Sequence, residues 1–386
     1  MPVVLGSDVL FDRQLLAGRT IGLVCNPASI DGQFRHVVDR AGAAGVRVGA
    51  IFGPQHGFNS DLQENMIESP HGRDARRNVP VYSLYSETRE PTAEMLAGLD
   101  ALVIDLQDVG TRIYTYIYTM ANCLVAARKQ GLPVVVCDRP NPIGGDAVEG
   151  PMLARGFESF VGQFPIPMRH GMTIGELARL FNDRFGLDAK LEVVKMQNWS
   201  RGDYWESSGL PWVLPSPNIP TVDSAVVYPG TVLLEGTNIS EGRGTNKPFE
   251  LVGAPWADAG RISAQLDALG LPGVRFRPAV FEPTFHKHAR IACGGCQIHV
   301  TDRAAFRAVE AGVAIIAAFR SAGPSAFQWR EPPYEYEHVK LPIDILYGSA
   351  GLREGLDGGE TAASLAAVWN SEMAAFSDIR EKYLLY

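Results

Sequence analysis

Long hydrophobic runs are missing from this sequence of 386 residues, because no apolar stretch approaches the roughly 20 residues of a membrane-spanning helix. Residues 1–16 lack the basic segment, the apolar core and the cleavage site of a signal peptide, and they already contain Asp8 and Asp12. We therefore expect a cytoplasmic protein with no membrane partner as the sequence is written, or an exported protein if a signal has been trimmed.

Positive charge is also scarce. The formal net charge of −8 argues against a nucleic-acid partner, because a phosphate backbone would be repelled. Cysteine is limited to five residues, an odd number that fits a reducing compartment. The pair Cys293 and Cys296 has a C-x-x-C spacing but no second pair of ligands nearby, so we expect plain thiols and no metal site.

Nucleotide-binding signatures are absent too. The sequence contains no P-loop, and the glycines of 42–49 precede an apolar run, whereas a dinucleotide fingerprint follows one. We therefore expect neither NAD nor ATP, and no cofactor of any kind.

The sequence does contain short apolar runs that alternate with helical segments. Strands are predicted at 20–25, 46–52, 101–106, 132–137 and 191–196, and helices at 36–44, 91–99 and 120–130, with a further short apolar segment at 79–84. This alternation is typical of βαβ units and predicts an α/β fold with a parallel sheet. Tyr114, Tyr116 and Tyr118 alternate as residues of a strand edge do, and we expect at least one of them in the core.

Polar clusters follow three of these predicted strands, at 53–58, 107–112 and 138–141. In an open parallel sheet, ligands bind beyond the carboxyl ends of the strands. We therefore predict one cleft at this edge, lined by Gln55, His56, Asp108, Arg112 and Asp138.

The later half of the chain is organised differently. Residues 209–248 are dense in Gly, Pro, Asn and Thr, which is common where loops shape a pocket. We place a domain boundary near 225, giving domains 1–225 and 226–386, and we expect the loop 235–243 to close the cleft. Asp302 is predicted to cap a helix that runs to Phe319 and is stopped by Gly323. Thr173 and Glu176 form a predicted capping box, which favours a structural role for Glu176.

The clusters combine carboxylates, amides, arginines and aromatics, without a serine elbow or a metal cluster. These residue types suit carbohydrate chemistry, because an acid must protonate a glycosidic oxygen and sugar hydroxyls need planar polar partners.

Long motifs make this interpretation more specific. They are FGPQHGF at 52–58, DLQDVGTRIYTYIYTM at 105–120, DRPNPIGG at 138–145, FVGQFPIPMRHGMTIGEL at 160–177, LPSPNIPT at 214–221 and YPGTVLLEGTNISEGRGTNKPFE at 228–250. The sequence resembles the NamZ-type exo-β-N-acetylmuramidases over nearly its whole length. The resemblance implies a Rossmann-like parallel-sheet N-terminal domain, a smaller α+β C-terminal domain, and an active site in the cleft between them. The implied activity is release of terminal N-acetylmuramic acid from the non-reducing end of peptidoglycan fragments.

The sequence departs from the family at one position. Much of the family carries a glutamate where Gln55 stands, and an amide cannot exchange a proton as a carboxyl group does. We predict Glu64 as the replacement, with Glu149 and Glu241 as further candidates, and Asp108, Asp138 and His56 as the other catalytic residues.

Recognition of the lactyl carboxylate of muramic acid calls for an arginine fork. Arg243 is the first candidate because its flanking glycines expose it, and Arg169, beside His170, is the second. The predicted substrate-binding residues are Gln55, Arg112, Tyr114, Arg139, Asn141, Glu149, Arg169, His170, Asn218, Glu235, Asn238, Glu241 and Arg243.

Two alternatives to a muramidase stay open at this point. The first is a pseudo-enzyme of the same fold that binds a cell-wall sugar without cleaving it. The second is a hydrolase of another class that uses the same crevice.

Overall fold

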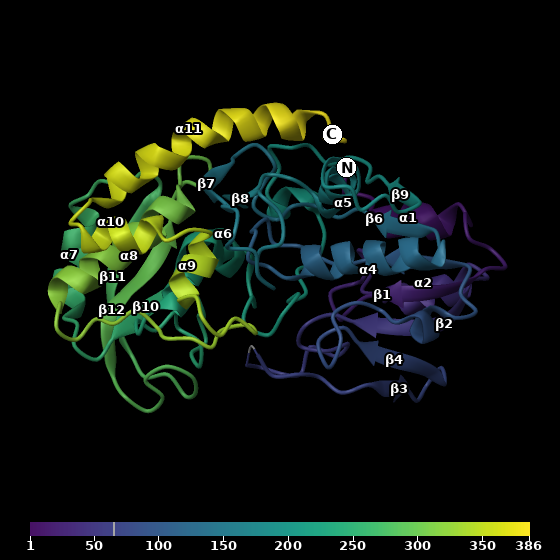
Figure 1. Cartoon of the computed structure of the whole chain (residues 1–386), viewed down its shortest axis with the longest axis horizontal. Helices are drawn as coiled ribbons and strands as arrows, with labels where there is room; N and C mark the ends of the chain where they lie inside the picture. Colours follow the sequence, from purple (N-terminus) through teal and green to yellow (C-terminus); the bar gives the residue numbers. More distant parts are fainter. Residues whose placement is uncertain (65) are drawn as a thin grey trace.

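The structure is a computed structural model that describes residues 1–64 and 66–386. Two bodies lie side by side in it (Figure 1). The first is built around a seven-stranded sheet, and the second around a three-stranded sheet covered by helices. No helix in these described ranges is long and apolar enough to cross a membrane.

The larger sheet has the strand order β3-β4-β2-β1-β5-β6-β9. Six strands run parallel and β3 pairs antiparallel at one edge. The parallel strands follow the order 3-2-1-4-5-6 of a doubly wound sheet, which reverses between β1 and β5. The strands are β1 (Thr20–Val24), β2 (Arg47–Gly53), β3 (Gly72–Asp74), β4 (Val79–Ser83), β5 (Ala101–Ile104), β6 (Val134–Cys137) and β9 (Leu191–Val194). The predicted α/β class and its strands are confirmed, with ends that differ by a few residues.

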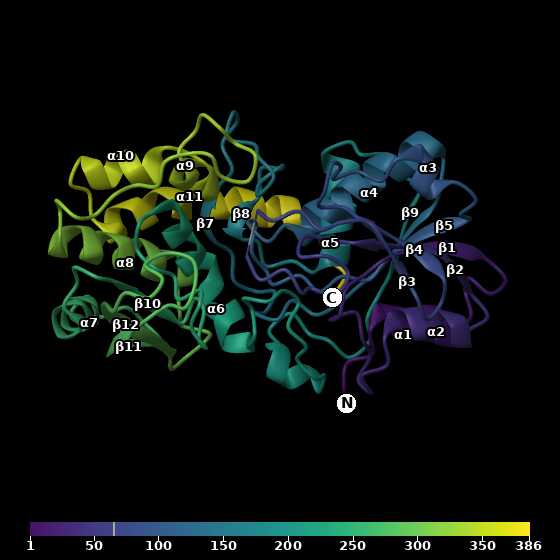
Figure 2. The same ribbon diagram turned by 90° about the horizontal axis from the view of Figure 1, so that it is seen from below.

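Helices cover both faces of this sheet, as Figure 2 shows. Leu23 and Val103 pack toward α1 (Gly6–Asp12) and α2 (Val37–Ala43), whereas Val24 and Ile104 belong to the core of the opposite face. That opposite face carries α3 (Ala93–Leu96), α4 (Tyr116–Gln130) and α5 (Ile174–Arg184). Burial on both faces explains why these strands are continuous apolar runs.

Helix α4 corrects one detail of the sequence interpretation. It begins at Tyr116, so Tyr116 and Tyr118 lie in its first turn and not on a strand edge. All three tyrosines are buried, as expected for at least one of them. A spacing of two over five residues does not separate a strand from the buried end of a helix.

The second body contains the antiparallel sheet β10-β12-β11, made of β10 (Leu251–Ala254), β11 (Val274–Phe281) and β12 (Cys293–Val300). Its helices are α6 (Val222–Thr231), η2 (Val232–Gly236), α7 (Ala259–Asp267), α8 (Ala308–Ala322), α9 (Pro342–Tyr347), α10 (Gly351–Asp357) and α11 (Ala362–Glu381). The predicted boundary near 225 falls inside α6, and division of the chain there stays a prediction. Helix α8 begins at Ala308, later than predicted, because Asp302 accepts from Ala304 N and Ala305 N in a separate turn.

Three connections join the two bodies. The hairpin of β7 (Glu149–Met152) and β8 (Pro167–Arg169) packs on α8 and α11. The short helix η1 (Trp205–Ser208) lies in the segment that leads to α6. Helix α11 runs back across the molecule and brings the C-terminus to the first body (Figure 1).

Close packing of α6 on α8 generates a stability prediction. A Cβ added to Gly230 would lie 1.8 Å from Ala308 O, so Gly230→Ala must push the helices apart. We expect a loss of about 1–3 kcal/mol in the free energy of unfolding. The matched control is Gly42→Ala in α2, where a Cβ meets no atom within 4 Å and a gain of about 0.5–1 kcal/mol is expected. Denaturant unfolding of both variants tests this, and equal stabilities would contradict the packing argument.

Candidate functional site

A cavity lies beyond the carboxyl end of β2, between the two bodies. Its walls come from both: the turn after β2, the start of α4 and the loop at 216–219 on one side, and α6, η2 and the loop at 334–335 on the other. The polar and aromatic side chains that line it are Gln55, His56, Tyr114, Thr115, Tyr116, Ser216, Asn218, Tyr228, Glu235, Arg243, Phe249, Tyr334 and Glu335.

Glu335 is the carboxyl group at which the two bodies meet. It accepts a hydrogen bond from Tyr85 Oη at 2.7 Å, and Gln55 Nε2 donates to its other oxygen at 3.2 Å. The Gln55 carbonyl oxygen accepts in turn from Thr115 Oγ1 at 2.8 Å. Glu335 is 4% exposed, and burial raises its pKa to about 7, against the lowering effect of the Tyr85 and Gln55 hydrogen bonds.

Backbone geometry holds Glu335 in place. Both Glu335 and Tyr336 have positive φ angles, of 46° and 68°. Non-glycine residues are rarely found there, and the strain persists only where the surroundings fix it. The backbone at Glu335 is therefore held by its surroundings, and the hydrogen bonds from Tyr85 and Gln55 orient the carboxyl group.

A second carboxylate, Glu235, belongs to a charged chain in the second body. It accepts from Arg243 Nη2 at 2.6 Å and from Tyr334 Oη at 2.6 Å. Arg243 Nε also lies 3.3 Å from Glu241 Oε1, and Glu241 accepts from Lys287 Nζ at 2.9 Å. Although burial disfavours its charge, Lys287, His286 and Arg243 together hold the pKa of Glu241 well below its usual value.

His56 follows β2 in a left-handed conformation, with φ 71°. Its Nδ1 lies 2.7 Å from the carbonyl oxygen of Leu62, which can only accept, so Nδ1 carries the proton. Burial lowers the pKa of His56 to about 4. At neutral pH the ring is uncharged and Nε2 is available as an acceptor.

The predicted site residues divide into two groups. The structure brings Gln55, His56, Tyr114, Asn218, Glu235 and Arg243 together at the cavity. The other predicted residues do not line it, namely Glu64, Asp108, Arg112, Asp138, Arg139, Asn141, Glu149, Arg169, His170, Asn238 and Glu241. The prediction of one cleft along the whole edge was too broad. β2 and β6 are three strand spacings apart, about 14 Å, so side chains that follow them are too distant to meet.

Asp138 directly follows β6, away from the cavity, and its buried carboxylate accepts hydrogen bonds from within the protein. Its carboxylate accepts from Gly175 N, Arg139 N, Thr173 Oγ1 and Tyr386 Oη. Burial raises the pKa of Asp138 to about 7. It therefore fastens the start of α5 and the C-terminus to the sheet. The predicted capping box of Thr173 and Glu176 is confirmed at this start.

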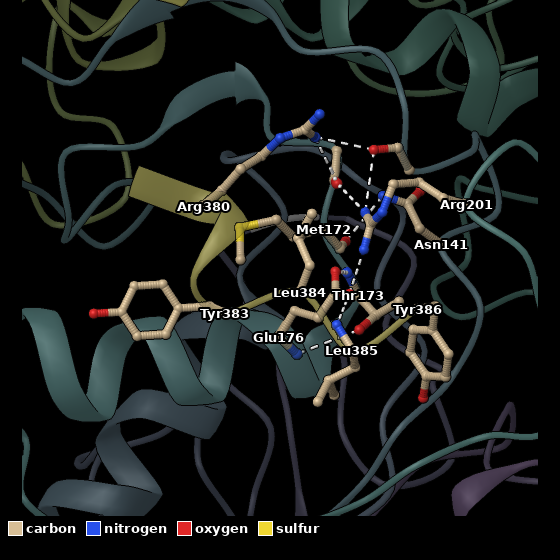
Figure 3. Close-up of polar contacts among 12 residues, drawn as sticks. Asn141, Met172, Thr173, Glu176, Arg201, Arg380, Tyr383, Leu384, Leu385 and Tyr386 are labelled. Atoms are coloured by element: carbon tan, nitrogen blue, oxygen red, sulfur yellow. Dashed lines mark hydrogen bonds and ion pairs between the residues drawn. The ribbon is translucent and has the colours of Figure 1, made fainter. Parts of the chain in front are cut away.

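The C-terminal segment completes the cover over this region (Figure 3). Arg380 and Arg201 both donate to Gly171 O at 2.9 Å, and Glu176 accepts from Arg201 and from Leu385 N. Asn141 Nδ2 donates to Met172 O at 3.0 Å in the same cluster. The amide of Asn141, a predicted substrate-binding residue, is therefore bonded within the protein, and Glu176 has the structural role that was predicted for it.

The remaining residues outside the cavity have partners within the protein. Arg112 donates to four backbone carbonyls, and Arg139 donates to the Asp105 carboxylate. His170 Nε2 lies 3.3 Å from Asp108 Oδ2. Glu149 accepts from Val309 N and Glu310 N at the start of α8, Arg169 donates to Ile143 O, and Asn238 binds Ala326 O. Glu64 is exposed. Their roles in catalysis or binding stay predictions, and this geometry favours structural roles for the buried ones.

Sequence reasoning missed Glu335, Tyr334, Thr115, Tyr228 and Phe249. A signal for the first two was present. Residues 331–338, EPPYEYEH, mix prolines, aromatics and carboxylates in the same way as the polar clusters after the strands. No predicted strand ends directly before these residues, so the rule that located the other polar clusters did not apply to them.

Comparison with known proteins agrees with this architecture. A family model described as the N-terminal part of exo-β-N-acetylmuramidase NamZ matches residues 21–223, and one for its C-terminal part matches residues 226–386. The chain belongs to the NamZ family. It is 46% identical over 384 residues to the peptidoglycan β-N-acetylmuramidase NamZ of Bacillus subtilis, covering 99% of this chain and 91% of that protein.

Solved structures with a similar fold extend the comparison. Two DUF1343 family proteins of Bacteroides fragilis are similar over 100% of this chain and 99% of their own. One has a TM-score of 0.90 at 33% identity, and the other a TM-score of 0.79 at 26% identity. The arrangement of the two bodies is therefore shared with experimentally determined structures.

The bonds of Asp138 generate a prediction that separates a structural role from a catalytic one. Asp138→Asn keeps an oxygen that accepts from the backbone N–H groups of Arg139 and Gly175. The hydroxyl groups of Thr173 and Tyr386 can accept from the new side-chain NH₂ group. We expect turnover within a few-fold of the unchanged protein, whereas loss of a general acid or base costs about 10²–10⁴ in rate. Asp138→Ala removes all four bonds and should lower the melting temperature. A stable Asp138→Asn protein without turnover would contradict this view.

Proposed function

We propose that this protein is a peptidoglycan glycoside hydrolase, an exo-β-N-acetylmuramidase that releases terminal N-acetylmuramic acid from the non-reducing end of peptidoglycan fragments. The observation that carries the proposal is the match to NamZ over nearly the whole chain, including 46% identity to a peptidoglycan β-N-acetylmuramidase. The cavity adds chemical support. It combines two buried carboxyl groups with aromatic and amide side chains, the groups that glycoside hydrolysis requires.

The cavity is also suited to an acidic sugar. Arg243 is the one arginine or lysine among the described residues that line it. N-acetylmuramic acid differs from N-acetylglucosamine by a lactyl ether with a carboxylate, and a guanidinium matches two carboxylate oxygens. The predicted role of Arg243 as reader of this carboxylate is kept as part of the proposal. Its side chain is not exposed as predicted, since it is 6% exposed and paired with Glu235 and Glu241.

The proposed activity is tested by turnover of a chromogenic β-N-acetylmuramide. We expect release of the chromophore by the purified protein, and release of N-acetylmuramic acid from a disaccharide with N-acetylglucosamine at its reducing end. The matched β-N-acetylglucosaminide is the specificity control. Binding of the muramide without turnover would favour the pseudo-enzyme alternative instead.

A prediction for Arg243 follows from its pairing. Arg243→Lys keeps a cation beside Glu235 and Glu241 but loses the planar fork, so the fold should survive. A hydrogen bond to a charged group contributes about 1.5–3 kcal/mol, so inhibition by free N-acetylmuramic acid should weaken about ten- to a hundredfold. Inhibition by N-acetylglucosamine should change little. Equal weakening of both inhibitors would exclude Arg243 as the reader of the lactyl group.

A further inference from the structure

We propose that Glu335 is the general acid of this protein, and that Gln55 and Tyr85 are positioning residues that aim its carboxyl group into the cavity. The inference rests on the proposed function and names the residue that carries its proton transfer.

Geometry carries the first step of the argument. Gln55 Nε2 donates to Glu335 Oε1 at 3.2 Å and Tyr85 Oη donates to Glu335 Oε2 at 2.7 Å, so two side chains of the first body hold this carboxyl group. Glu335 and Gln55 both line the cavity. By contrast, Glu64 is exposed, Glu149 accepts at the start of α8, and Glu241 is bound to Lys287. Among the carboxylates considered, Glu335 is the one that reaches the cavity beside Gln55.

The surroundings of Glu335 keep a proton available near neutral pH. The titratable and charged groups that interact with it are Tyr85, Tyr228, Tyr334, Glu235 and Arg243. Burial and the charge of Glu235 favour its neutral form, whereas Tyr85, Gln55 and Arg243 favour the ionised form. A buried carboxyl group beside a second carboxylate is the arrangement by which glycosidases keep an acid protonated while its partner stays ionised.

The step itself balances within the cavity. Glu335 gives its proton to the glycosidic oxygen as the bond from that oxygen to the anomeric carbon breaks, and the electron pair of the bond stays on the oxygen. Water supplies the oxygen of the new hydroxyl group at the anomeric carbon. This water loses one proton and Glu335 regains one, so the site ends in its starting protonation state.

The main test varies the leaving group. Glu335→Gln should lower turnover of a muramyl disaccharide by about 10²–10⁴, because the sugar alkoxide needs a proton to depart. Turnover of a dinitrophenyl β-N-acetylmuramide should fall less than about tenfold, because dinitrophenolate departs unprotonated. The matched control is Glu331→Gln, an exposed carboxylate of the same loop outside the cavity lining, which should leave both activities unchanged. Equal losses on both substrates, or no loss on the disaccharide, would overturn the proposal.

A pH profile supplies a second, independent test that does not require the Glu335 variant to fold. If Glu335 is the acid, kcat/KM for the disaccharide should fall as the pH rises through about 7, where its carboxyl group loses the proton. Tyr85→Phe removes a donor that favours the ionised form, so this basic limb should move to higher pH. A limb that stays in place or moves to lower pH would contradict the assignment.

Failure of the inference differs from failure of the proposed function. An unchanged protein that hydrolyses neither muramide would refute the function and the inference with it. The unchanged protein could instead hydrolyse the muramides normally while Glu335→Gln lowers turnover of the disaccharide and of the dinitrophenyl substrate by the same factor. That result would refute the role of Glu335 and leave the proposed function standing.

Discussion

The guanidinium of Arg112 ties together the parts of the chain that form the cavity. It is fully buried and donates to the carbonyls of Pro151 and Ile166 in the β7–β8 hairpin region, and to those of Leu346 and Tyr347 in α9. The loop that holds Arg112 leads directly into Thr115 and α4 on one wall of the cavity. The segment before α9 holds Tyr334 and Glu335 on the other. Because four carbonyls of three segments share one side chain, the two walls cannot separate without leaving buried acceptors unpaired.

Ion pairing allows the second body to bury two carboxylates, Glu235 and Glu241, close to each other. Glu235 and Glu241 alternate with Arg243 and Lys287, so each ion has an opposite neighbour within 3.3 Å. A buried charge without such a partner would be strongly destabilising. Among the residues that the structure describes, Glu335 forms no ion pair of this kind, and its carboxyl group accepts hydrogen bonds from Tyr85 and Gln55. Its burial is therefore compatible with a neutral carboxyl group, while Glu235 is held beside a cation. One cavity thus offers two different environments to two glutamates.

The sequence was informative where local pattern decides the structure. The inner strands β1, β5 and β6 are buried along their whole length because both faces of the sheet are covered, and they are apolar runs in the sequence. Gln55 and His56 lie at the cavity because they closely follow β2. Contacts between residues that are far apart in the sequence could not be predicted from local pattern. Gln55 meets Glu335 across 280 positions, Asp138 meets Tyr386 across 248, and Arg112 meets Tyr347 across 235. The same residue types that suggest a sugar site, such as Asp138 and Arg112, also satisfy buried backbone groups. Spacing alone does not tell these two uses apart.

The amide of Gln55 has a physical consequence for the acid beside it. With a glutamate at position 55, two carboxyl groups would face each other across a single hydrogen bond, and they would share one proton in a coupled titration. An amide at position 55 cannot take that proton. Its carbonyl oxygen accepts from Thr115, which directs the amide group toward Glu335 as a donor. The proton then belongs to Glu335 alone, and the Gln55 hydrogen bond keeps the pKa of this acid from rising further in its buried setting. An amide at position 55 therefore leaves a single, oriented acid where a second carboxyl group would give a shared one, and a single acid with a defined donor beside it suits general acid catalysis.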